Sequence, residues 1–177
     1  RHGRGCLVEG NVFFGGNVPN SGGIRLANQD HVVLNNYIQD VAGTSYQAAL
    51  AIMDGTTWTA PNPTPDRSGG YVVVKDCVIA HNTIINAADP VNFGVGKGGS
   101  GRTTPPKDNT FAANLIVSSH APLFTLTDTP VNPTYLSNLV WGAATGLPAN
   151  PDLIVANPLL TPDGLGIQRP SAIGPAA

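Results

Sequence analysis

The segment Ile79-Ala80-His81-Asn82-Thr83-Ile84 decides the fold, because five other segments align with it without gaps. Bulky apolar or aromatic side chains stand three residues before and two residues after the shared asparagine of every copy. Subtracting the asparagine numbers gives spacings of 25, 46, 32, 24 and 19 residues, the length range of one coil of stacked strands. The repeat predicts an all-β protein, a right-handed parallel β-helix of about six coils. The aligned asparagines are Asn11, Asn36, Asn82, Asn114, Asn138 and Asn157.

The columns of this alignment have a physical meaning in a coiled stack. Each residue lies about 4.8 Å from its counterpart in the next coil, so like side chains pack on like. At a sharp corner asparagine tolerates left-handed backbone angles, and its amide can bond to the amides above and below. We therefore expect apolar columns inside the stack and an asparagine ladder at one corner. A further strand is expected in each coil, at 23–26, 49–52, 91–94 and 122–125.

The whole chain, residues 1–177, is predicted to be one β-helix domain. Unequal spacings are explained by excursion loops at 56–70 and 96–108, which are rich in Gly, Pro and Thr. The proline-rich tail at 160–177 is expected to cover the last coil. Since a coil begins immediately at residue 1, we expect further coils, or a second chain, on the N-terminal side.

Composition excludes several classes of protein. Only 11% of the residues are charged, and 21 Gly and 16 Pro disfavour a helical fold. A formal net charge of -2 offers no broad basic face for nucleic acid. The apolar runs are too short for a transmembrane helix, so no membrane partner is expected.

Two cysteines, Cys6 and Cys77, both stand five residues before their asparagine. They share a column but lie two coils apart, about 9.6 Å, which exceeds the reach of a disulfide. We expect two free, buried thiols.

The N-terminal region resembles a known family. The run Arg1-His2-Gly3 is followed by 10–13, by Gly22-Gly23-Ile24-Arg25-Leu26, and by His31 with Asn35-Asn36-Tyr37. In order and spacing these runs are similar to the central block of polysaccharide lyase family 6, which contains alginate and chondroitin lyases. The looser segments 105–114 and 157–175 resemble later parts of that family.

The resemblance implies β-elimination of a uronic-acid polymer, usually alginate, by a secreted or periplasmic enzyme. In that family a lysine abstracts the C5 proton, and the arginine of Arg-His-Gly assists departure of the O4 oxygen. On that basis Arg1 is the catalytic candidate, and His2 is expected to orient Arg1 or touch substrate. Many members bind calcium, Ca2+, but the lysine and the calcium ligands lie upstream of this run, so no metal ligand is assigned in this chain.

Arg25 is the candidate for binding the substrate carboxylate. Arg1 stands ten residues before Asn11 and Arg25 eleven before Asn36, so the two should lie about 5 Å apart on adjacent coils. Two guanidinium groups so close repel unless an anion lies near them, and each can bind a carboxylate bidentately. The pair therefore predicts a site for an anionic polysaccharide.

Other polar residues allow weaker predictions. His31 is expected to be packed at a corner, and His81 and His120 at the surface. Lys97 and Arg102 could line a groove for the polymer. Tyr46, Trp58 and Tyr71 could stack on sugars, and a structural role in the core or a loop is an equal alternative for each.

Two other functions remain open. A non-catalytic β-helix could bind acidic polysaccharide or be structural. A pectin-type hydrolase would need a close carboxylate pair, which Asp30, Asp40 and Asp54 do not offer at matching columns.

Overall fold

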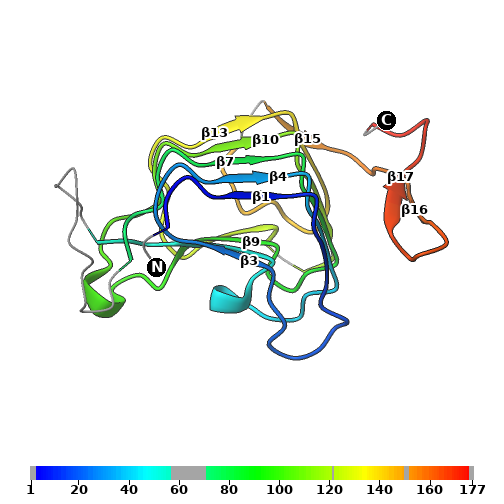
Figure 1. Ribbon diagram of the computed structural model, residues 1–177. Helices are drawn as coiled ribbons and strands as arrows, with labels where there is room; N and C mark the ends of the chain where they lie inside the picture. The colour runs from blue at the N-terminus through cyan, green and yellow to red at the C-terminus, as the bar shows by residue number, and fades with distance from the viewer. Residues whose placement is uncertain (1–2, 57–70, 121, 150–151, 176–177) are drawn as a thin grey trace.

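The computed structural model describes residues 3–56, 71–120, 122–149 and 152–175, and the chain is a right-handed parallel β-helix, as predicted (Figure 1). Successive coils contribute one short strand to each of three parallel sheets. Sheet A contains β1 (Leu7–Glu9), β4 (Val32–Leu34), β7 (Val78–Ala80), β10 (Thr110–Ala112) and β13 (Thr134–Leu136). Sheet B contains β2 (Val12–Phe14), β5 (Tyr37–Gln39), β8 (Thr83–Ile85), β11 (Leu115–Ser118), β14 (Asn138–Gly142) and β15 (Leu153–Val155). Sheet C contains β3 (Ile24–Leu26), β6 (Leu50–Met53), β9 (Val91–Val95) and β12 (Phe124–Leu126).

The predicted apolar columns form the core. In sheet A the strands pair so that one inward column runs through Val8, Val33, Ile79, Phe111 and Tyr135. Aromatic rings from sheets A and C meet inside the upper coils, where the centroids of Phe93 and Phe111 are 5.0 Å apart. Such edge-to-face pairs stabilise a core beyond their buried area. The four strands predicted for sheet C are confirmed, with their bounds shifted by one or two residues.

The asparagine ladder is confirmed for five of its six members. From Asn11 to Asn114, each side-chain Nδ2 donates to Oδ1 of the next asparagine, at 2.9 Å from Asn11 to Asn36 and 2.8 Å from Asn114 to Asn138. Each Oδ1 also accepts the backbone N–H of the asparagine below it, as Asn82 does from Asn36 at 3.0 Å. Groups that a buried corner would otherwise leave unpaired are thus satisfied.

The expected left-handed conformation belongs to a different residue. The residue before each ladder asparagine has φ between 50° and 67°, and these residues are Gly10, Asn35, His81, Ala113 and Ser137. The left-handed residue makes the turn, and its successor can then point its amide into the stack.

Asn157 is not the sixth member, so the prediction for the last repeat is wrong. Strand β15 pairs with β14 in sheet B, which sets Leu153 beside Asn138 and Val155 beside Val140. The side chain of Asn157 is exposed to solvent, and its Oδ1 accepts the N–H of Leu159. The apolar residues around Asn157 have the spacing of the repeat, which would place Ile154 in the inward column of sheet A. The backbone of β15 instead pairs with β14, so Ile154 lies beside Leu139 in sheet B.

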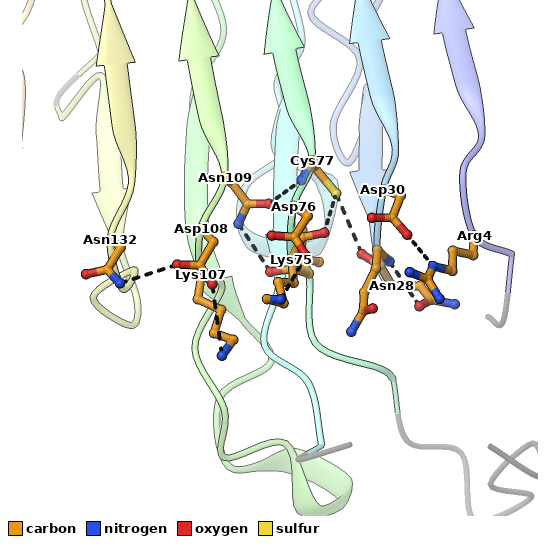
Figure 2. Close-up of polar contacts among 12 residues, drawn as sticks. Arg4, Asn28, Asp30, Lys75, Asp76, Cys77, Lys107, Asp108, Asn109 and Asn132 are labelled. Atoms are coloured by element: carbon orange, nitrogen blue, oxygen red, sulfur yellow. Dashed lines mark hydrogen bonds and ion pairs between the residues drawn. The ribbon is translucent and has the colours of Figure 1, made fainter. Parts of the chain in front are cut away.

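A second corner precedes sheet A and carries a row of charged side chains (Figure 2). Its left-handed positions have φ between 48° and 65°, and they are Gly5, Asp30, Asp76, Asp108 and Asn132. Asp30 pairs with Arg4, and Asp76 pairs with Lys75 at 2.8 Å. Figure 2 also shows Asn132 donating to Asp108 on the neighbouring coil. The cations of this row, Arg4, Lys75 and Lys107, are each paired with an aspartate. The row therefore has a structural role at this corner and, within the described coils, offers no unpaired cation to a ligand.

The two thiols are free, but only one is buried. Cys77 is 1% exposed, whereas Cys6 is exposed, which contradicts the prediction of two buried thiols. Register places Cys6, His31 and Cys77 in one column. Cys6 belongs to the first described coil, so among the described residues its column continues on one side only. Cys77 has neighbours in the column on both sides.

The tail ends in an antiparallel hairpin of β16 (Leu160–Pro162) and β17 (Gln168–Pro170). The hairpin lies beside the stack (Figure 1), and the N–H of Gln168 donates to the hydroxyl of Tyr37 at 2.8 Å. Tyr37 belongs to β5, so the tail returns along the flank of sheet B toward the early coils.

No helix in the four described ranges is long and apolar enough to cross a bilayer.

Candidate functional site

Arg25 is placed on the outer surface of sheet C by the alternation of its strand. It is the central residue of β3, and its neighbours Ile24 and Leu26 are buried in the core. Its side chain is exposed and enters no ion pair with the described residues. Arg25 is therefore exposed on the outer face of sheet C, and its binding of a substrate carboxylate stays a prediction.

Tyr46 lies beneath the Arg25 side chain. It belongs to the short 3-10 helix η1 (Ser45–Gln47), and the Arg25 guanidinium carbon is 5.8 Å from the centre of its ring. This distance is within the range of a cation–π contact. The hydroxyl of Tyr46 accepts a hydrogen bond of 3.1 Å from the guanidinium of Arg102.

Arg102 links this arrangement to the second excursion loop. It follows the 3-10 helix η2 (Gly99–Gly101), is 7% exposed, and lies 5.2 Å from the centre of the Tyr71 ring. Its Nε donates to the carbonyl of Gly96 at 2.9 Å. The sequence named Tyr46, Tyr71 and Arg102 separately. The structure brings them together, because Arg102 contacts both tyrosines and Tyr46 also faces Arg25.

A hollow of about 380 Å³ opens beside Arg25. Tyr71 and His31 contribute to its wall, and so does Gly3, which directly follows Arg1 and His2 in the chain. Arg1 and His2 themselves, like Trp58, lie outside the described residues. The hollow is lined by Gly3, Cys6, Val8, Ile24, Arg25, Leu26, Ala27, His31 and Tyr71.

His31 is a structural residue, as predicted. It is 6% exposed, its Nδ1 accepts the N–H of Cys6 at 3.1 Å, and its Nε2 lies 2.9 Å from the carbonyl of Ala27. These contacts assign the neutral tautomer with the proton on Nε2. His81 and His120 are exposed, also as predicted.

Asp54, which the sequence analysis considered only as a member of a hydrolase pair, is a buried acid beside Val95, at the start of the second excursion loop. Asp54 is 0% exposed, and neither of its oxygens meets a hydrogen-bond donor in the described chain. Burial, followed by the charge and hydrogen bonding of Asp128, raises the pKa of Asp54 to about 7. A protonated Asp54 can donate to Asp128, whereas two ionised carboxylates repel.

Asp128 is held in the charged form by Lys97. Burial by itself would raise the pKa of Asp128, but the 2.8 Å hydrogen bond from Lys97 and the N–H of Thr129 lower it. The repeat alone does not predict this pair, because β9 lies between β6 and β12 in sheet C. Asp54 and Asp128 each stand two residues after a member of one sheet C column, Ile52 and Leu126.

No set of three or more His, Cys, Asp or Glu side chains that could hold a metal ion occurs within the described ranges.

A family model described as Chondroitinase B matches residues 1–129. A mutant of the PL6 family alginate lyase AlyGC is 28% identical with a TM-score of 0.82, over 97% of this chain and 22% of that one. The PL6 family polysaccharide lyase from Pseudopedobacter saltans is 27% identical with a TM-score of 0.64, over 85% of this chain and 39% of that one. No curated protein matches the chain.

A PL6 alginate lyase in complex with a trisaccharide shares the fold, at 21% identity and a TM-score of 0.74, over 98% of this chain and 40% of that one. The chain thus spans from about a fifth to two fifths of the length of these solved structures. Its fold is that of the PL6 family lyases. The chain belongs to the chondroitinase B family, in polysaccharide lyase family 6.

Proposed function

We propose that the protein containing this chain cleaves a uronic-acid polymer, most simply alginate, by β-elimination outside the cytoplasm. The observation that carries the proposal is the exposed Arg25, supported by an aromatic ring and placed at a hollow that Gly3 also lines. A guanidinium with no acid partner in the described chain suits the carboxylate of a uronate, which it can bind bidentately.

The chemistry requires cations near the carboxylate. A base takes the C5 proton, the electrons of the C–H bond form a C4–C5 double bond, and the C4–O4 bond breaks. Charge that develops on the carboxylate is stabilised by positive groups that are already oriented, which lowers the barrier. We assign this role to Arg25.

Arg1 and His2 take the remaining roles. Arg1 hydrogen-bonds to the departing O4 oxygen, which then takes up a proton, and His2 orients Arg1 or contacts the sugar. A guanidinium holds its proton tightly at any ordinary pH, which makes direct proton donation by Arg1 difficult, so water delivers that proton. The base, and the ligands of a calcium ion in the whole protein, are residues other than Arg1, His2 and Arg25.

The proposal is tested by mixing the whole protein with alginate, dermatan sulfate or polygalacturonate and following the ultraviolet absorbance of the unsaturated uronate product. We expect a rise with one polymer, and a loss of at least 100-fold in kcat/KM for Arg25→Gln and for Arg1→Ala. The control is Arg169→Gln, because Arg169 pairs with Asp163 in the tail hairpin at 2.8 Å. Polymer binding without any product would support the non-catalytic alternative and overturn the proposal.

A further inference from the structure

Tyr46 is the only described residue whose ring faces Arg25 and whose hydroxyl is held by another arginine. The ring lies 5.8 Å from the Arg25 guanidinium carbon, and the hydroxyl accepts from Arg102 at 3.1 Å. Tyr46 therefore connects an exposed cation with a buried one.

The backbone beneath Tyr46 is anchored on the sheet. Asp89, which is 5% exposed, accepts the N–H of Ser45 at 2.9 Å. The same carboxylate accepts hydrogen bonds from Asn92 at 2.7 Å and from Thr125 at 2.8 Å. Since Asn92 and Thr125 stand in the same sheet C column as Arg25, one network holds η1 against the strands that carry the arginine.

Loop 96–102 closes on Tyr46 from the other side, and Gly96 makes that approach possible. With φ of +82°, a Cβ at Gly96 would lie 2.6 Å from the Tyr46 hydroxyl and 2.8 Å from Nε of Arg102. Gly98 has a similar φ of +77°, but a Cβ there would meet nothing within 4 Å. The two glycines therefore share a backbone conformation and differ in what surrounds them.

We propose that Tyr46 and Arg102 are positioning residues, which hold the Arg25 guanidinium in the orientation that receives the substrate carboxylate. This inference rests on the proposed function of Arg25. A long arginine side chain loses rotamer entropy when it binds an anion, and support beforehand reduces that cost. Tyr46 and Arg102 thereby influence substrate binding without contacting the sugar.

The glycine pair supplies the test. Gly96→Ala should displace the Tyr46 hydroxyl or the Arg102 guanidinium, and we expect KM for the polymer that the wild type cleaves to rise about tenfold with a smaller change in kcat. Gly98→Ala imposes a comparable backbone strain, so it should lower the melting temperature similarly and leave KM unchanged. Tyr46→Phe keeps the ring and removes the acceptor for Arg102, and an intermediate rise in KM is expected.

A second readout does not depend on activity. In the wild type the Arg25 guanidinium carbon lies 5.8 Å from the centre of the Tyr46 ring. The nuclear magnetic resonance signal of the Arg25 Nε–H, identified by its loss in Arg25→Lys, should therefore be shifted by the ring. Gly96→Ala should move this signal toward the value of an unsupported arginine, and Gly98→Ala should not.

The outcomes separate the two ideas. A wild-type protein with no lyase activity would overturn the proposed function, and the kinetic role of Tyr46 with it. An active wild type in which Gly96→Ala and Gly98→Ala give the same KM and the same Arg25 signal would overturn the positioning role alone.

Discussion

Asn36 and Asn82 are 46 residues apart in the chain, yet Nδ2 of Asn36 donates to Oδ1 of Asn82 at 3.0 Å. The two coils keep the same register despite this separation, because β4 pairs with β7 and β5 with β8 without a shift. Coil length is thus free to vary while the corner stays constant.

The buried ladder should contribute strongly to stability. In Asn82→Ala, the backbone and side-chain amides of Asn36 lose their shared acceptor and the carbonyl of Val33 loses a donor, so we expect the free energy of unfolding to fall by about 2–4 kcal/mol. Asn157→Ala is the matched control, and its effect should be within about 0.5 kcal/mol. Denaturant titrations measure both, and equal losses would contradict the ladder's role.

Ala113 is the ladder-corner residue least suited to its conformation. It has φ of 50° and an exposed side chain, so Ala113→Gly should relieve strain and raise the free energy of unfolding by roughly 1 kcal/mol. Ala112 lies in β10, where Ala112→Gly should instead cost about 0.5–1 kcal/mol. Thermal melts of the two variants should shift in opposite directions.

The thiols should differ in reactivity. Cys6 is exposed, whereas burial raises the pKa of Cys77 to about 11. Because the thiolate is the reactive form, a thiol reagent at neutral pH should modify Cys6 quickly and Cys77 only after unfolding. Peptide mass spectrometry after timed labelling distinguishes the sites, and early labelling of Cys77 would mean that the core opens locally.

Asp54 should make stability depend on pH. Its pKa of about 7 in the folded chain exceeds the ordinary 3.8, so the folded state holds a proton that the unfolded state has released between these values. The free energy of unfolding should therefore fall as pH rises from about 4 to 7 and level off above. In Asp54→Asn this decline should shrink.

The size of the effect follows from the pKa difference. Each unit of pKa shift corresponds to about 1.4 kcal/mol, so the variant should gain roughly 2 kcal/mol relative to wild type between pH 5 and pH 8. Chemical denaturation at both pH values measures this. If the free energy of unfolding changed equally with pH in the wild type and in Asp54→Asn, Asp54 would not be the group responsible for the pH dependence.

Much of the fold could be predicted from local pattern. The columns through Val33 and Ile79, the ladder from Asn11 to Asn138, and the strands of sheet C are periodic features that need no knowledge of the loops. The prediction failed at Asn157, where an accidental copy of the pattern lay beyond the last full coil, and at Cys6, whose column continues on one side only.

The sequence by itself determined the coil, because stacking at a constant spacing requires like residues at like positions and leaves a visible repeat. Tertiary structure alone decided the surroundings of Arg25 and the pairing of Asp54 with Asp128. Tyr46, Arg102 and Asp128 reach those places through turns and loops of unequal length. Such contacts depend on side-chain direction and burial across different coils, and neither quantity repeats along the chain.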